Sequence, residues 1–220
     1  MIVGLEARGA SSLYPKISVQ LQDVSKKIGK KVLFEELTVQ VKPGECLAVT
    51  GPNGSGKSTL LKMVAGIIQP TTGTIQFLGD GRQLDVEERM ACLGLVSPEI
   101  VFYGDMTGRE NIAFFTRARG LKCSLEQVED CCQTVGLAAD KDNLVHTYST
   151  GMRQRLKFAV MLATKPLLWL LDEPSSNLDA DGKSLVSQLI VNALAGQATV
   201  IIGTNEPWEA QHAGYKIELT

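Results

Sequence analysis

The residues best suited to chemistry lie in the run GPNGSGKST at positions 51–59. This run fits the pattern G-x-x-x-x-G-K-[ST] and follows a short apolar run, 46–49, that is typical of a buried strand. Glycines let such a loop turn its backbone N–H groups toward phosphate oxygens, and the start of the following helix adds partial positive charge. We therefore predict a nucleotide site formed by Gly51, Pro52, Asn53, Gly54, Ser55, Gly56, Lys57, Ser58 and Thr59. Within it, Lys57 is expected to reach the β- and γ-phosphates, and the Ser58 hydroxyl to bind Mg²⁺.

Two carboxylates at the end of a second apolar run extend this chemistry. The run LLWLLDEP, at 167–174, has the pattern of a fully buried strand that ends in Asp172 and Glu173. Asp172 is placed to hold Mg²⁺ through a water molecule. Glu173 can orient a water molecule for in-line attack on the γ-phosphate. The alternative for Glu173 is a solvated carboxylate at a strand end.

A third apolar run, TVIIGTNEP at 199–207, ends abruptly in polar residues. In open α/β sheets, ligands bind at the carboxyl ends of the strands, so Asn205 stands where a ligand is expected. The alternative is that Asn205 only closes a turn at the end of the strand.

These motifs need a sheet that brings several strand ends together. Strands alternating with helices predict an α/β fold of the P-loop NTPase type with a mostly parallel core sheet. Alternating apolar and polar residues at 17–25 and 31–45 add an N-terminal antiparallel β subdomain, and residues 85–163 are expected to form a helical subdomain. A capping box from Thr107 to Glu110 opens one of its helices. We expect an extension at 1–16, followed by one domain at 17–220.

Composition excludes several classes of protein. The net charge of −2 includes no basic excess, so no nucleic-acid partner is expected. No apolar run approaches the roughly 20 residues that cross a bilayer, and residues 1–16 lack the apolar region of a signal peptide. The five cysteines, without any C-x-x-C spacing, are expected to be free thiols in a reducing cytoplasm: Cys46, Cys92, Cys123, Cys131 and Cys132.

The order of the motifs resembles that of the ABC (ATP-binding cassette) ATPases. Between the phosphate loop and the Asp-Glu strand lies YSTGMRQRL, at 148–156, which is similar to the family signature L-S-G-G-Q, and SSNLD at 175–179 resembles the D-loop. This form of the signature looks most like that of exporter subfamilies, including the haem-exporter ATPases of cytochrome c maturation. The resemblance implies that Ser149 and Gly151, at a helix start, contact the ATP held by another subunit.

Because Ser149 and Gly151 would contact the ATP of another subunit, the resemblance also implies protein partners. Two cassettes, either two copies or one copy and a paralogue, would enclose two ATP molecules with Mg²⁺. The chain would then drive an integral membrane permease from the cytoplasmic face of the cell membrane, as a peripheral subunit. Apolar side chains at Phe102, Tyr103 and Met106, in a loop before the capped helix, predict where the permease docks; the alternative is that both aromatics pack under the loop.

The sequence departs from the family pattern at four positions. Thr150 replaces the first signature glycine, and Ile28 stands where an aromatic usually stacks on adenine. Pro98 replaces the usual glutamine, and the neighbouring Glu99 is either a substitute metal ligand or a solvated loop residue. Asn205 replaces the histidine that contacts the γ-phosphate; its amide can donate a hydrogen bond but carries no charge.

The sequence thus supports one leading function and two alternatives. The leading function is ATP hydrolysis that powers a membrane exporter, with Glu173 and Asn205 as catalytic residues. Neither His146 nor His212 is expected to replace the missing histidine. The alternatives are a soluble ABC ATPase that acts on a nucleic acid or an assembly machine, and a nucleotide sensor that barely hydrolyses ATP.

Overall fold

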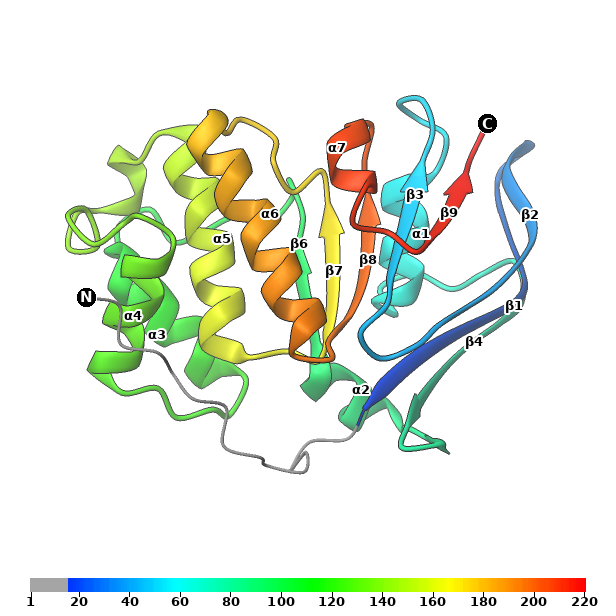
Figure 1. Ribbon diagram of the computed structural model, residues 1–220, viewed down its shortest axis with the longest axis horizontal. Coiled ribbons are helices and arrows are strands. Elements are labelled where there is room, and N and C mark those ends of the chain that lie inside the picture. The colour runs from blue at the N-terminus through cyan, green and yellow to red at the C-terminus, as the bar shows by residue number, and fades with distance from the viewer. Residues whose placement is uncertain (1–15) are drawn as a thin grey trace.

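The structure is a computed structural model that describes residues 16–220, and it contains two sheets flanked by helices (Figure 1). The predicted extension at 1–16 lies outside the described residues, apart from Lys16. The first sheet is antiparallel, with the strand order β2-β1-β4-β5. Its strands are β1 (Ile17–Ile28), β2 (Lys31–Val41), β4 (Thr72–Gly79) and β5 (Arg82–Gln83). The predicted N-terminal antiparallel β subdomain is thereby confirmed.

The second sheet is parallel throughout, with the strand order β6-β7-β8-β3-β9. Its strands are β3 (Cys46–Thr50), β6 (Leu93–Val96), β7 (Leu168–Asp172), β8 (Thr199–Gly203) and β9 (Tyr215–Glu218). Every residue of β7 and β8 is buried, which explains why both read as unbroken apolar runs rather than alternating ones. Helices α1 (Lys57–Val64) and α6 (Ala180–Ala195) pack against this sheet, and the short α7 (Pro207–Ala210) follows β8.

The helical part contains α3 (Gly108–Ala118), α4 (Leu125–Thr134), the 3₁₀ turn η1 (Val145–Thr147) and α5 (Thr150–Thr164), with α2 (Val86–Cys92) before it. Both hydrogen bonds of the predicted capping box at Thr107 and Glu110 are present at the start of α3. The predicted helical range of 85–163 also includes β6, which belongs to the parallel sheet. Four residues are too few to show a period, so this buried strand was missed.

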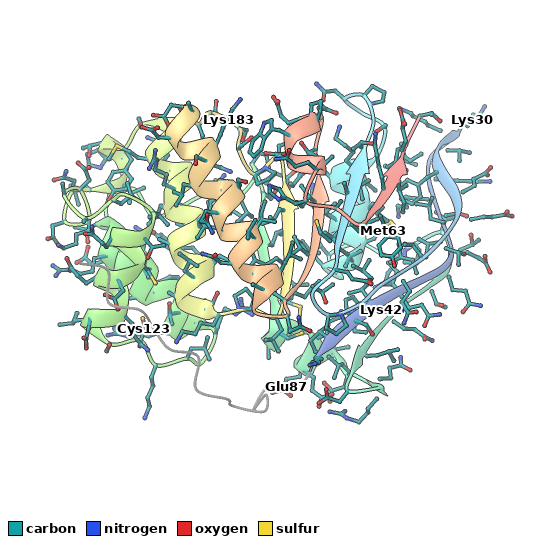
Figure 2. All side chains as sticks on the ribbon, viewed as in Figure 1. Lys30, Lys42, Met63, Glu87, Cys123 and Lys183 are labelled. Atoms are coloured by element: carbon teal, nitrogen blue, oxygen red, sulfur yellow. The ribbon has the colours of Figure 1, made fainter. Side chains whose placement is uncertain are left out.

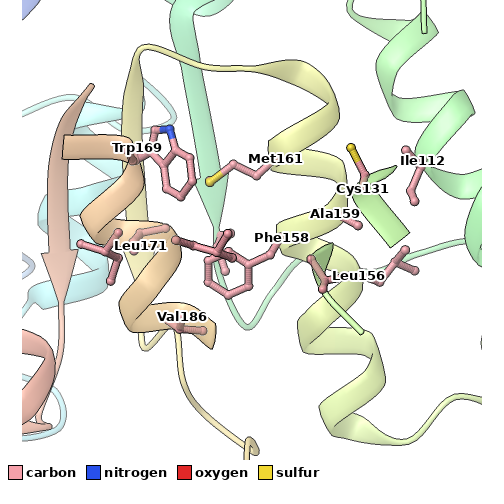
Figure 3. Packing of buried hydrophobic residues seen from close by; sticks show 14 of the residues in the cluster. Ile112, Cys131, Leu156, Phe158, Ala159, Met161, Trp169, Leu171 and Val186 are labelled. Atoms are coloured by element: carbon pink, nitrogen blue, oxygen red, sulfur yellow. The ribbon is translucent and has the colours of Figure 1, made fainter. Parts of the chain in front are cut away.

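Two apolar clusters hold the helices to the sheets. Figure 3 shows the first, in which Phe158 and Met161 of α5 point toward Trp169 and Leu171 of β7. Phe158 is completely buried and α6 adds Val186, so the cluster fixes α5 relative to the strand that ends in Asp172. The second cluster joins α1 to the parallel sheet and to β1.

Charged side chains of both signs lie around the periphery of the molecule, as Lys30, Lys42 and Glu87 illustrate in Figure 2. Met63 of α1, by contrast, is buried in the second cluster. No helix within residues 16–220 is long and apolar enough to cross a membrane.

Candidate nucleotide-binding and catalytic site

The phosphate loop joins β3 to α1 and depends on its glycines. Gly51 and Gly56 have φ angles of 139° and 111°, in the region that L side chains rarely adopt. A Cβ on Gly51 would lie 2.1 Å from the Leu219 carbonyl oxygen, and one on Gly56 would lie 3.2 Å from the Phe34 ring. No side chain caps the start of α1 at Gly56. The first N–H groups of that helix therefore have no side-chain acceptor and suit a phosphate.

Lys57 is held inside this loop by oxygen atoms. Its side chain is 6% exposed, and Nζ donates to the carbonyl oxygens of Gly51 at 2.8 Å and Pro52 at 3.3 Å. The third partner is Oδ1 of Asn205 at 2.9 Å. An ammonium has three hydrogens to donate, so at least one of these bonds must give way before Lys57 can reach a phosphate.

Ser58 and Asp172 form the oxygen pair that the sequence predicts for Mg²⁺. The Ser58 hydroxyl donates to Asp172 Oδ1 at 3.0 Å, at the buried end of β7. Burial raises the pKa of Asp172, against the opposing effects of Ser58, Lys62 and Lys57. A carboxylate with a neighbouring hydroxyl fits Mg²⁺, which takes one or two protein oxygens and completes its shell with phosphates and water.

Glu99, the alternative metal ligand from the sequence, has a different partner. Its Oε1 lies 2.6 Å from Nζ of Lys62, and its side chain is 70% exposed. The structure therefore pairs Glu99 with α1 on the surface and does not join it to Ser58 and Asp172. Pro98 lines a separate cavity beside α5.

Glu173 follows β7 and lies beside the lysine. Its Oε1 is 3.8 Å from Nζ of Lys57, and its side chain is 29% exposed. Burial raises its pKa, Lys57 acts against this, and the nearby Glu209 raises it further. Glu173 is therefore partly buried beside the loop, and its catalytic role stays a prediction. It is close enough to the phosphate loop to orient a water molecule there.

Both the oxygen and the nitrogen of the Asn205 side-chain amide form hydrogen bonds with residues of the phosphate loop. Oδ1 accepts from Lys57, and Nδ2 donates to Oδ1 of Asn53 at 2.7 Å. The turn after β8 is closed by another residue, because Thr204 Oγ1 accepts from the Glu206 N–H at 2.8 Å. The structure thus brings Asn205 to the predicted site, and its contact with the γ-phosphate stays a prediction.

A cavity of about 460 Å³ opens beside the loop and includes Ile28, Gly54 and Glu173 in its lining. Ile28 is 57% exposed and contributes an aliphatic surface where an adenine ring could rest. Sequence reasoning missed Lys31, which lines the same cavity and donates to the Gly54 carbonyl oxygen at 3.2 Å. The sequence signal that could have identified Lys31 was its position shortly after Ile28, on the other side of a hairpin turn.

Ser149 and Gly151 lie at the start of α5 and do not line this cavity. The Ser149 hydroxyl caps α5 by accepting from the Met152 N–H at 3.2 Å. Gly151 is packed against the D-loop, since a Cβ there would lie 3.1 Å from the Asn177 carbonyl oxygen. Both lie outside the cavity beside the phosphate loop of their own chain, so their predicted contact with ATP would be with the nucleotide of a second cassette.

The chain matches the family model described as ABC transporter over residues 34–176. It is 34% identical to the uncharacterized ABC transporter ATP-binding protein YdbJ of Bacillus subtilis (strain 168), over 74% of this chain and 53% of that protein. It is 30% identical to Nod factor export ATP-binding protein I of Paraburkholderia xenovorans (strain LB400), over 92% of this chain and 67% of that protein. The chain thus spans between about half and two thirds of the length of these curated relatives.

The fold agrees with solved structures. A putative ABC transporter ATP-binding protein from Pyrococcus furiosus superposes with a TM-score of 0.79 at 23% identity, over 92% of this chain and 97% of that one. The family match runs from β2 through the phosphate loop to the segment after Glu173, and so covers the residues that build most of this site. The chain therefore belongs to the ABC transporter family of ATP-binding proteins.

Proposed function

We propose that this chain is the ATP-binding and hydrolysing subunit of a membrane exporter. The observation that carries the proposal is that side chains from the ends of two strands, β7 and β8, converge on the loop that follows a third, β3. Lys57 contacts both Asn205 and Glu173. Ser58, the next residue after Lys57, donates to Asp172 at the end of β7. These groups provide a cation for the phosphates, a general base, an amide donor and two oxygens for a metal ion.

Each residue has a definite task in phosphoryl transfer. Ser58 and Asp172 would hold Mg²⁺, which supplies positive charge to the phosphate oxygens. Lys57, once it leaves one of its present oxygen partners, would donate to the β- and γ-phosphates. Glu173 would orient the attacking water and accept its proton. Asn205 would donate from Nδ2 to a γ-phosphate oxygen as negative charge develops there.

The arrangement favours a pair of cassettes. Because Ser149 and Gly151 lie away from the phosphate loop of their own chain, they are available to the nucleotide of a second copy or a paralogue. ATP would then join the two subunits, and hydrolysis would release them. This cycle supplies a motion that a membrane partner can use.

The membrane partner would dock at the loop 101–106, which follows β6. Val101 and Tyr103 are 81% and 52% exposed, whereas Phe102 packs edge-on against Phe115 at 5.6 Å. The side chain of Asn111 holds the loop, accepting from the Tyr103 N–H and donating to its carbonyl oxygen. A rigid loop with exposed apolar side chains suits a partner surface. An exporter accords with the relative named for Nod factor export, and we propose that this chain approaches it from the cytoplasmic face.

Steady-state ATP hydrolysis by the purified chain tests the proposal. Wild type should hydrolyse MgATP, and Glu173→Gln should reduce turnover to a small residual rate while binding MgATP normally. Glu87→Gln is the matched control, because it neutralises an exposed carboxylate on α2, away from the loop (Figure 2). If wild type binds MgATP but turns it over no faster than Glu173→Gln, the chain is a nucleotide sensor and the proposal fails.

A further inference from the structure

The backbone at Glu173 takes a conformation that few residues with side chains adopt. Its φ angle is 46°, in the left-handed region. The Glu173 N–H donates to the Gly203 carbonyl oxygen of β8 at 2.8 Å. One residue later, the Pro174 carbonyl oxygen accepts from Nε2 of Gln154 on α5 at 2.6 Å. A turn in this region persists only where its surroundings hold it, and these two bonds are part of that support.

A third bond comes from α7 and involves Glu209, whose carboxylate also raises the pKa of the nearby Glu173. Glu209 is completely buried, and its Oε1 accepts from the Ser175 N–H at 3.0 Å. Its Oε2 is buried without a hydrogen-bond partner, and no Lys, Arg or His forms an ion pair with Glu209 within residues 16–220. Burial raises its pKa, against the lowering effect of hydrogen bonds from the side chains of Ser175 and Thr204 and from the Ser175 backbone. A fully buried carboxylate is normally paired with a cation, so its presence here calls for a specific role.

We propose that Glu209 is a positioning residue for Glu173. By accepting from Ser175, it fixes the chain two residues beyond Glu173 and so the direction of the Glu173 carboxylate. Glu209 acts through this turn, because it does not line the cavity beside the phosphate loop. Since α7 begins two residues after Asn205, the same short helix helps to place both groups that serve the γ-phosphate. The inference rests on the ATP hydrolysis proposed above.

Two substitutions at Glu209 distinguish the effect of its hydrogen bond from the effect of its side-chain size. Glu209→Gln keeps an oxygen that can accept from Ser175, whereas Glu209→Met keeps the length and removes the acceptor. Turnover of Glu209→Met should fall at least about tenfold, because a displacement of 1 Å at a reacting group can lower the rate about 10²-fold. Its affinity for MgATP should stay within about threefold of wild type. Glu209→Gln should keep turnover within about threefold of wild type.

A double-substitution cycle shows whether the effect passes through Glu173. Residual single-turnover hydrolysis is measured with radiolabelled ATP in Glu173→Gln, with and without Glu209→Met. In that background Glu209→Met should cause no further loss. Glu206→Gln is the control, because it neutralises an exposed carboxylate at the start of α7. Glu209→Ala, measured alongside, keeps the comparison intact if the methionine variant does not fold.

Three results would overturn the inference. One is unchanged turnover in a folded Glu209→Met or Glu209→Ala protein. Another is the same loss in the Glu173→Gln background as in wild type. The third is a loss of turnover in Glu209→Gln equal to that in Glu209→Met, since the hydrogen bond would then be irrelevant. An inactive wild type would instead contradict the proposed function, and the inference would fall with it.

Discussion

Replacing Asn205 with alanine removes two hydrogen bonds at the phosphate loop, to Lys57 at 2.9 Å and to Asn53 at 2.7 Å. Asn205 is exposed, so the two bonds together should contribute about 1–2 kcal/mol to the free energy of unfolding. For a chain of this size, each kcal/mol shifts the melting temperature by about 2–4 °C. We therefore expect the melting temperature of Asn205→Ala to fall by about 2–8 °C.

The effects on binding and on turnover should differ. Lys57 now donates to three oxygens, and Asn205 supplies one of them. The alanine variant frees Lys57 from that bond, so its affinity for MgATP should be unchanged or higher. Turnover should fall about 10²–10³-fold, the usual effect of removing one donor that stabilises the transition state.

Three measurements on the same preparations decide between a catalytic and a structural role. Calorimetry gives the affinity for MgATP, single-turnover kinetics give the rate, and thermal melting gives the stability. Asn205→His, which keeps a donor, should preserve or raise turnover and add a pH dependence near neutrality. Unchanged turnover in Asn205→Ala, together with a lower melting temperature, would refute the γ-phosphate role.

Three other predictions follow from burial and exposure. Lys57→Ala should abolish MgATP binding in calorimetry, and near-wild-type affinity would contradict the phosphate-loop assignment. Tyr103→Glu should prevent co-purification with the membrane subunit and keep ATP binding, and normal co-purification would argue against docking there. Phe102→Glu should instead lower the melting temperature, because Phe102 packs against the core. Burial raises the pKa of Cys46 to about 12, so this thiol should stay protonated and resist alkylation at neutral pH, while the less buried Cys123 reacts first. Mass spectrometry after brief treatment with iodoacetamide checks the order.

The sequence was sufficient for those parts of the site that depend on local pattern. The phosphate loop has a fixed spacing, and Asp172 and Glu173 directly follow an apolar run, so both could be placed without a structure. The alternating strands β1 and β2 and the capping box at Thr107 were readable for the same reason. Each depends on residues that are close together in the chain.

Contacts between distant segments could not be predicted in this way. The bond from Asn205 to Asn53 joins residues 152 positions apart, and that from Glu209 to Ser175 joins residues 34 apart. Glu209 lies on a four-residue helix, which gives no detectable period. Strand β6 is equally short, and its burial between neighbouring elements, rather than its sequence pattern, decides its conformation.

The mass of Glu173→Gln in solution, with and without MgATP, tests most directly whether two copies of this chain close on ATP. The variant should bind ATP and hydrolyse it only very slowly, so the closed pair should accumulate. Size-exclusion chromatography with light scattering should show a monomer without nucleotide and a dimer with saturating MgATP. Adding Ser149→Arg, which places a bulky side chain at the exposed start of α5, should abolish the dimer. A Glu173→Gln protein that binds MgATP and remains monomeric at saturation would contradict the closure of two copies of this chain on ATP.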